Sequence, residues 1–217
     1  VKEGMLKAGF ADVWEVAVGA DLCTIEEAKD FLAEVPEKLP FMGTSCCPAW
    51  SVMAKKLFPE FKDCISMALT PMTLTARLIK HEHPNAKVVF IGPCAAKKLE
   101  AMRKSVRSEV DFVLTFEEMA GIFAAKHVDL TTIEEDPDGV NDASTDGRSF
   151  AVGGGVAKAV VNVIQHRYPG REVKVTSSQG LRECRKMMQE AVAGKYPGYL
   201  LEGMACPGGC VAGAGTM

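Results

Sequence analysis

The chain has 217 residues, of which 47% are hydrophobic and 24% are charged, and its formal net charge is −3. This composition is that of an ordinary globular protein and excludes a disordered chain, and the length permits one large domain or two lobes sharing a core. The slight acidic excess gives no electrostatic reason to bind phosphate backbones, so we expect no nucleic-acid partner. The sequence has no apolar run of about 18 residues and no export leader. We therefore expect no membrane span and a cytoplasmic location.

In the first part of the chain, short apolar runs alternate with segments of helical pattern. Two helix starts have capping-box spacing, Thr24 with Glu27 and Thr115 with Glu118, and Pro48 suits the first position of a helix. In chain order we predict a strand at 13–16, a helix at 24–34, a strand at 41–44, helices at 49–58 and 71–81, a strand at 87–91, a helix from 97, a strand at 111–114 and a helix after 115.

The rest of the chain, from residue 129, begins with a change of composition. Residues 129–148 are acidic and rich in Asp, Gly and Thr, and we interpret them as a surface loop or lobe boundary. After it we predict, in chain order, a helix opened by three glycines at 153–155 and ending near 165, a strand at 173–175, a helix at 180–193 and a strand at 199–204. Strands that alternate with helices indicate an α/β fold with mostly parallel sheets.

The eight cysteines fall partly into three clusters with unusual local chemistry. Cys46 and Cys47 precede a proline, Cys94 follows Gly-Pro, and Cys206 and Cys210 flank a Pro-Gly-Gly turn. Each cluster comes just after a predicted strand, where α/β proteins bind ligands. Four thiolates at one site fit an iron–sulfur cluster or zinc, although the spacing is not that of a zinc ribbon. Uncoordinated buried thiols are the third possibility.

Three sequence segments, taken together, resemble the catalytic domain of [FeFe]-hydrogenases. Residues 44–50 (Thr-Ser-Cys-Cys-Pro-Ala-Trp) are similar to the first signature of this family, residues 93–100 (Pro-Cys-Ala-Ala-Lys-Lys-Leu-Glu) to the second and residues 202–210 (Glu-Gly-Met-Ala-Cys-Pro-Gly-Gly-Cys) to the third. They occur in the family's order, and residues 19–22 and 154–156 are similar as well. The resemblance spans nearly the whole chain and implies a two-lobed α/β domain with the cofactor between the lobes.

The resemblance implies a six-iron cofactor, the H-cluster. This is a [4Fe–4S] cubane joined to a two-iron subcluster that carries CO, cyanide and a bridging dithiolate amine. By position in the motifs, the metal ligands would be Cys47, Cys94, Cys206 and Cys210, of which Cys210 would also bridge to the two-iron subcluster.

The resemblance also implies roles for residues that do not ligate iron. Cys46 would pass protons to and from the bridging amine, with Glu27, Asp30 and Ser66 as the relay, and Lys97 would donate a hydrogen bond to a cyanide ligand. The cofactor would also be lined by Met204, Pro93, Gly154 and Gly155. The remaining thiols Cys23, Cys64 and Cys184 match no motif, and we expect them to be buried small side chains. We expect the four histidines on the surface, with no metal-binding role.

Several positions depart from the family's usual pattern. Gly92 stands where the family usually has Met, Ala49 replaces a glycine, and Asp30 replaces a Glu. Residues 213–217 differ from the usual Gly-Gly-Gly-Gln-Pro continuation. These departures resemble the slower, sensory branch of the family.

The expected activity is therefore reversible H2 oxidation and proton reduction, slow and used for H2 sensing. The alternative is a non-catalytic protein of the cluster-assembly type that binds only a cubane. We expect residues 1–217 to be an excerpt of an H-cluster domain, with lobes at 1–128 and 149–217 joined by the loop 129–148. The implied partners are H2 and protons, a ferredoxin-like electron carrier or accessory cluster domain, and maturation proteins.

Overall fold

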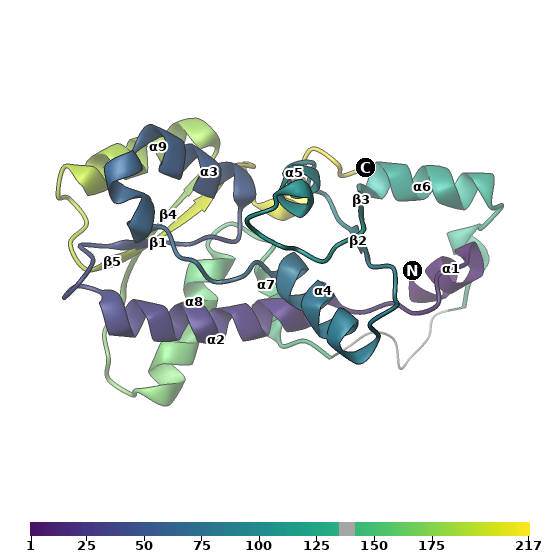
Figure 1. Cartoon of the computed structure of the whole chain (residues 1–217), viewed down its shortest axis with the longest axis horizontal. Helices are drawn as coiled ribbons and strands as arrows, with labels where there is room; N and C mark the ends of the chain where they lie inside the picture. Colours follow the sequence, from purple (N-terminus) through teal and green to yellow (C-terminus); the bar gives the residue numbers. More distant parts are fainter. Residues whose placement is uncertain (135–141) are drawn as a thin grey trace.

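The computed structural model describes residues 1–134 and 142–217. Two separate parallel sheets are surrounded by helices, and both termini lie near the end of the molecule that contains α1 and α6 (Figure 1). The strands are β1 (Met42–Gly43), β2 (Val89–Ile91), β3 (Phe112–Leu114), β4 (Lys174–Gln179) and β5 (Tyr199–Met204). The α-helices are α1 (Lys2–Ala8), α2 (Val16–Glu34), α3 (Pro48–Leu57), α4 (Pro71–Glu82), α5 (Ala96–Met102), α6 (Phe116–Ala125), α7 (Thr145–Ser149), α8 (Gly155–Arg167) and α9 (Leu181–Val192). Short 3-10 turns occupy Pro59–Cys64, Leu130–Thr132 and Cys210–Ala212.

The larger sheet has three parallel strands in the order β1-β5-β4. Helices α3 and α9 cover one face of it, and α2 and α8 cover the other (Figure 1). Because successive side chains of a strand point to opposite faces, Leu200 packs on the α2 and α8 side, while Leu201 packs on the α3 and α9 side. Both are fully buried, which explains why strand β5 reads as an almost continuous apolar run.

The smaller sheet pairs only β2 with β3, also in parallel. Helix α5 packs against β3, and α4 connects this part of the molecule to the long helix α2. The pairing brings Ile91 opposite Leu114, so the chain leaves both strands at the same edge. This edge leads directly into the Gly92-Pro93-Cys94 turn.

The α/β fold class with parallel sheets flanked by helices is confirmed, and most predicted elements occur within a few residues of their predicted positions. Two local predictions are wrong. Residues 13–15 form no strand, and α2 begins at Val16 rather than near Thr24. Thr24 lies inside this helix and donates its hydroxyl to the carbonyl of Ala20 at 2.8 Å, so its spacing to Glu27 does not form a cap.

The expected lobes, 1–128 and 149–217, do not coincide with the two sheets. Strand β1 comes from the first range but pairs with β5 from the second, and α2 packs against α8. Within the acidic stretch 129–148, residues 135–141 lie outside the described residues. The described remainder contains a 3-10 turn and the start of α7, which packs on α2 and α8 and is therefore part of the folded body.

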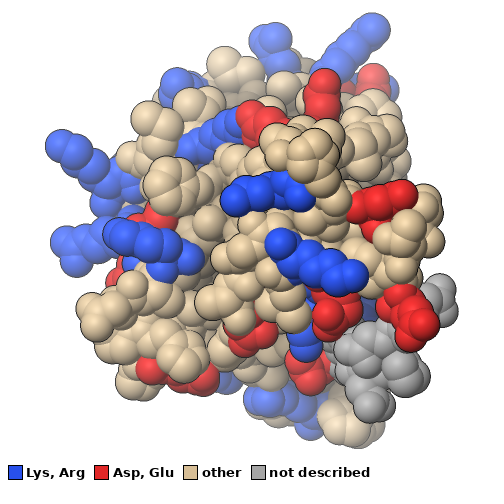
Figure 2. Space-filling view, turned by 90° about the vertical axis from the view of Figure 1, so that its right-hand side faces the viewer, with Lys and Arg blue, Asp and Glu red and all other residues tan. Residues whose placement is uncertain are grey.

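The surface charge and the helices of the described residues match the expectations drawn from the near-neutral net charge and from the short apolar runs. On the face shown in Figure 2, basic and acidic side chains are interspersed rather than gathered into a patch of one sign. None of the helices in this part of the chain has both the length and the apolar character needed to cross a membrane.

Candidate metal centre

One pocket of about 160 Å³ lies where the segments that follow β1, β2 and β5 meet. All four cysteines that the resemblance names as metal ligands line it, and so do Cys46, Lys97 and Met204. The complete lining is Cys46, Cys47, Pro48, Ala49, Cys94, Ala95, Ala96, Lys97, Met204, Ala205, Cys206, Gly209, Cys210, Gly213 and Ala214. The pocket thus joins the carboxyl ends of strands from both sheets, which is where α/β proteins place ligands.

The Cys46-Cys47 turn is held between strand β1 and helix α3. The amide of Thr44 donates to the carbonyl of Leu201 at 2.9 Å and extends the β1–β5 pairing past the end of β1. The indole of Trp50 then donates to the carbonyl of Thr44 at 3.0 Å. Cys47 is the N-cap of α3, and Pro48 takes the first helical position, which requires no amide hydrogen. The Cys47 thiol therefore lies at the positive end of a helix.

Glycines shape the loop between Cys206 and Cys210. Gly208 and Gly209 both have a left-handed backbone, with φ of 90° and 92°. A methyl group on Gly209 would come within 2.5 Å of the carbonyl oxygen of Ala151, so no larger residue fits there. Val152 and Gly209 form an isolated bridge, which anchors the loop to the segment that precedes α8.

The Cys94 turn is fastened to the C-terminal segment. The amide of Gly215 donates to the carbonyl of Pro93 at 3.0 Å, and Gly213 packs directly against the same carbonyl. Pro93 itself does not line the pocket. Its contribution in this structure is the carbonyl that fixes the turn carrying Cys94.

Burial and the proximity of the thiols to one another both raise the pKa values of Cys206 and Cys210. Burial, followed by the neighbouring Cys47 and Cys94, raises the pKa of Cys210 to about 11. Burial, followed by Cys94 and Cys47, also raises the pKa of Cys206. The backbone amide of Ala205 donates to the sulfur of Cys47 at 3.4 Å. Hydrogen bonds to a ligating sulfur are one of the ways in which proteins set a cluster's potential.

The arrangement of donor atoms distinguishes a cluster from a single ion. In residues 1–134 and 142–217, no three His, Cys, Asp or Glu side chains are grouped closely enough to hold one metal ion. A zinc ion needs every thiolate about 2.3 Å from its centre, whereas the ligands of a cubane stand on separate corners. Four thiols around one pocket without a single-ion cage therefore fit a multi-iron cluster better than zinc.

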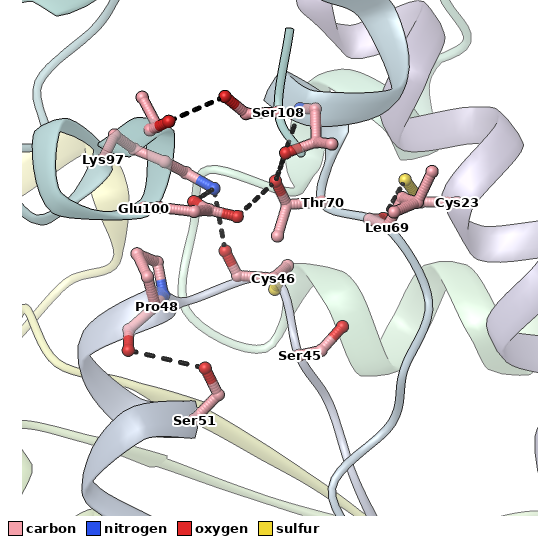
Figure 3. A network of polar contacts seen from close by, with 12 residues as sticks. Cys23, Ser45, Cys46, Pro48, Ser51, Leu69, Thr70, Lys97, Glu100 and Ser108 are labelled. Carbon is pink, nitrogen blue, oxygen red and sulfur yellow. Dashed lines mark hydrogen bonds and ion pairs between the residues drawn. The ribbon is translucent and has the colours of Figure 1, made fainter. Parts of the chain in front are cut away.

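Lys97 enters the pocket as part of a buried polar network (Figure 3). Its ammonium donates to Glu100 at 2.7 Å and to the carbonyl of Cys46 at 3.2 Å. The other carboxylate oxygen of Glu100 accepts the hydroxyl of Thr70 at 2.8 Å. The network connects the start of α5, the start of α4 and the cysteine turn. An ammonium has three hydrogens, so these contacts leave one for a ligand in the pocket.

The three remaining candidates for the proton relay lie outside the pocket lining. Glu27 on α2 is buried, and its Oε1 atom has no hydrogen-bond partner. Burial raises the pKa of Glu27 to about 7, although the Ser66 hydroxyl and the Ser45 backbone lower it. Asp30, one turn further along α2, is half-buried, and desolvation followed by Glu34 raises its pKa. Ser66 is buried, and its hydroxyl accepts the amide of Ala68 at 3.1 Å.

Cys46 connects this acidic group to the pocket. It lines the pocket, and burial raises the pKa of its thiol well above the usual value. The Glu27 carboxylate is the next cause of this increase. Cys46 shares the pocket with the four ligand candidates, whereas Glu27 lies outside its lining.

The two glycines expected to line the cofactor have structural roles at the start of α8 instead. Neither Gly154 nor Gly155 belongs to the pocket lining. Gly154 is the N-cap of α8, and its amide donates to Glu202 Oε1 at 2.7 Å. A methyl group on Gly155 would collide with the backbone of Ser149. The left-handed backbone of Gly154, with a φ of 86°, and the close packing of Gly155 against Ser149 explain the two glycines.

Two buried acids were missed in the sequence interpretation. Glu100 and Glu202 belong to the second and third cysteine signatures, and both residues are buried, with 3% and 0% of their surface exposed. One signal in the sequence could have identified them: each acid stands among apolar residues, where the pattern predicts burial. A buried acid requires a hydrogen-bond or charge partner, so such a position indicates a structural or functional role. The remaining thiols Cys23, Cys64 and Cys184 are buried outside the pocket, as predicted, and all four histidines are exposed.

Comparison with known proteins identifies the family. The model of the iron only hydrogenase large subunit, C-terminal domain, matches residues 1–214. The periplasmic [Fe] hydrogenase large subunit of Nitratidesulfovibrio vulgaris is 30% identical, over 96% of this chain and 60% of its own length. The cytosolic iron-sulfur assembly component 3 of Mus musculus is 26% identical, over 97% of this chain and 55% of its own. A solved [FeFe]-hydrogenase, HydA(deltaEFG), superposes with a TM-score of 0.76 at 25% identity, covering 99% of this chain and 72% of that one.

A parallel α/β scaffold with four cysteines around one pocket defines an iron–sulfur class of protein. Within that class, the chain belongs to the family of iron-only hydrogenase large subunits, as a relative of their C-terminal domain. It spans 60% of the length of the Nitratidesulfovibrio relative and 55% of the mouse relative.

Proposed function

We propose that the chain is the H-cluster domain of an [FeFe]-hydrogenase that interconverts H2 with two protons and two electrons. The observation that carries the proposal is the single pocket shared by four cysteines with Cys46, Lys97 and Met204. A cubane alone needs four thiolates, but it has no use for a fifth thiol or a buried ammonium at its side. The departures at Gly92, Ala49 and Asp30 favour a slow enzyme used for H2 sensing.

The residues present fit the proposed cofactor. Cys47, Cys94, Cys206 and Cys210 would hold the cubane, and Cys210 would also hold the two-iron subcluster. When bound, the six-iron group would supply the redox chemistry of H2 cleavage. Met204, which is buried at the end of β5, would pack beside the two-iron subcluster. Pro93, Gly154 and Gly155 do not line the pocket and would support the segments that do.

Lys97 would orient a diatomic ligand rather than transfer protons. Its ammonium is held in place by Glu100 and by the carbonyl of Cys46, so the remaining N–H has a defined position. Cyanide is an anionic acceptor, and a charge-assisted hydrogen bond in a buried site is among the strong ones. The ion pair with Glu100 keeps the charge of Lys97 compensated while no ligand is bound.

Protons would leave the site through Cys46 and the acids on α2. The Cys46 thiol would hold a proton at the site and exchange it with Glu27, whose uncommitted Oε1 atom can accept one. A pKa of about 7 for Glu27 suits a group that must gain and lose a proton near neutral pH. Ser66 would stabilise the carboxylate, and the half-buried Asp30 would pass the proton to water.

The reaction requires a partner that carries electrons to and from the site, and the described residues show no second group of cysteines around a pocket that would do this. We propose a ferredoxin-like carrier or an accessory cluster domain, together with maturation proteins that install the two-iron subcluster. We further propose a cytoplasmic location, where thiols stay reduced for cluster binding.

A second function is supported by a different observation. The chain is also 26% identical to cytosolic iron-sulfur assembly component 3 over nearly its whole length. It would then be a non-catalytic protein of the cluster-assembly type that carries a cubane alone. In that case Cys46 and Lys97 would have only structural roles.

Infrared spectroscopy with an iron count separates the two functions. The chain should be produced together with hydrogenase maturation enzymes, and Cys94→Ser should serve as a variant lacking one proposed ligand. A hydrogenase shows bands of bound CO and cyanide and more iron than a cubane holds, and the Cys94→Ser variant loses both. A sample that holds only cubane iron and shows no such bands overturns the hydrogenase proposal in favour of the assembly type.

A further inference from the structure

Glu202 is a fully buried carboxylate whose two oxygens both accept backbone amides. It lies in strand β5 and is 0% exposed. Its Oε1 atom accepts from Gly154 and its Oε2 atom from Ala157, both at 2.7 Å. None of the ion pairs formed by the described residues includes it. Burial raises the pKa of Glu202, and the hydrogen bonds from the amides of Ala157 and Gly154 oppose this increase.

These amides belong to the beginning of helix α8, which lacks an ordinary cap. The N-cap is Gly154, with a φ of 86° and no side chain to accept the free amides of the first turn. The carboxylate of Glu202 supplies the missing acceptor from a neighbouring strand. A negative charge at this end of a helix is favoured by the helix dipole.

The segment just before α8 is in turn bound to the loop between Cys206 and Cys210. The amide of Gly153 donates to the carbonyl of Gly208 at 3.3 Å, and the amide of Val211 donates to the carbonyl of Ala151 at 3.1 Å. Val152 and Gly209 form the bridge between these two contacts. Two backbone hydrogen bonds, which flank this bridge, therefore join residues 151–153 to the cysteine loop.

We infer that Glu202 is a positioning residue of the metal centre. Its carboxylate holds residue 154, and residues 151–153 then hold the loop that presents Cys206 and Cys210 to the pocket. The inference rests on the four-cysteine centre of the proposed function, but not on H2 turnover. Both oxygens must be acceptors, because each faces an N–H group. The Glu202→Gln variant therefore keeps the shape of the side chain but turns one acceptor into a donor.

Hydrogen exchange measured by mass spectrometry on the whole chain tests the inference. We expect Glu202→Gln to speed exchange at least about tenfold in residues 151–157 and also in 206–211, and to leave α6 unchanged. A tenfold change corresponds to about 1.4 kcal/mol, a typical cost for losing a hydrogen bond to a charged group. The matched control is Glu118→Gln, which removes a carboxylate that caps α6 through Thr115. That variant should speed exchange in α6 alone.

A second readout follows the metal centre itself. After chemical reconstitution with iron and sulfide, Glu202→Gln should hold less iron per chain and give a broadened electron paramagnetic resonance signal of the reduced cubane, while Glu118→Gln should match the parent. If Glu202→Gln does not fold, Glu202→Asp replaces it, because Asp keeps the charge but is one methylene too short to reach both amides.

Two results would overturn the inference. One is faster exchange in 151–157 with 206–211 unchanged, which reduces Glu202 to a helix cap. The other is a normal cubane signal despite faster exchange in both segments. The exchange result does not require bound iron, so a chain that fails as a hydrogenase still decides whether Glu202 positions the loop.

Discussion

The ammonium of Lys97 lies 2.7 Å from a carboxylate oxygen of Glu100, and their side chains are only 10% and 4% exposed. Such a pair adds little net stability when intact, because both ions lose their hydration. Removal of one partner, however, leaves the other charge buried and uncompensated. The pair thus makes the placement of Lys97 at the pocket dependent on a residue three positions away on α5.

We expect Glu100→Ala to lower the free energy of unfolding by about 3 to 5 kcal/mol, the usual cost of breaking a buried ion pair. Urea unfolding measures this. The control is Lys98→Ala, also on α5, which breaks an exposed ion pair with Glu118 of α6 and should cost less than about 1 kcal/mol. Equal losses in both variants would contradict the assignment of Lys97 and Glu100 as a buried pair.

Glu27 should make stability depend on pH. Burial raises its pKa from 4.5 to about 7, so the folded state binds a proton that the unfolded state has already lost in this range. Its contribution is therefore fully present below pH 4.5 and declines as the pH rises towards 7. Relative to Glu27→Gln, the parent should lose about 3 kcal/mol across this interval. Urea unfolding at a series of pH values measures the difference, and the exposed Glu26→Gln should run parallel to the parent. If the stability of Glu27→Gln also changes with pH in parallel with that of the parent, the pKa of Glu27 is not raised.

Cys46→Ala should separate proton transfer from metal binding. Loss of a proton-transfer group typically costs about 10² to 10⁴ in rate, whereas the four proposed ligands stay intact. We expect H2 turnover to fall at least about 100-fold with unchanged iron content. Cys23→Ala, which removes a buried thiol outside the pocket, serves as the control and should retain activity. Normal turnover in Cys46→Ala would remove this thiol from the mechanism.

The four proposed ligands can be distinguished from the other buried thiols by iron content. Cys206→Ser should bind markedly less iron than the parent after reconstitution, because it removes one thiolate from the pocket. Cys64→Ser changes a buried thiol in the core beneath α3 and should keep its iron, although with lower stability. The measurement is iron per folded chain, with folding checked by circular dichroism. Equal iron in the two variants would argue against the four-cysteine site.

Gly203 lets the cysteine strand pack on an aromatic ring. A methyl group at this position would overlap the indole of Trp50, which itself is fully buried. We expect Gly203→Ala to destabilise the chain by about 1 to 3 kcal/mol through overpacking. Gly121→Ala in α6 has nothing within 4 Å and should instead stabilise it by about 0.5 to 1 kcal/mol. Thermal unfolding of both variants tests the opposite signs.

Much of the local structure could be predicted from the chain alone. The strand at 199–204, the helix opened by Pro48 and the capping box of Thr115 and Glu118 all occur as predicted. These features depend on neighbours within a few residues. The same spacing at Thr24 and Glu27 gave a wrong prediction, because packing against α4 and α8 continues α2 through that point.

The sequence could predict which residues form the candidate site, but not which side chains and backbone groups they contact. Cys46, Cys47, Cys94 and Cys206 drew attention because they follow predicted strands, and the resemblance of the three signatures then gave the ligand set, with Cys210 included. Glu100 and Glu202 were missed as functional residues, since their partners are Thr70 and the amides at the start of α8. Such partners are brought close only by folding.

The sequence by itself determined the parallel α/β class, the helix starts and the cysteines that stand at strand ends, because these follow from local periodicity and turn chemistry. Tertiary structure alone decided that β1 pairs with β5 and not with its neighbours in the chain, and that residues 151–154 support the loop of Cys206 and Cys210. The physical reason is that strand pairing and amide capping act between segments more than 40 residues apart, a range at which the sequence pattern carries no information about contact.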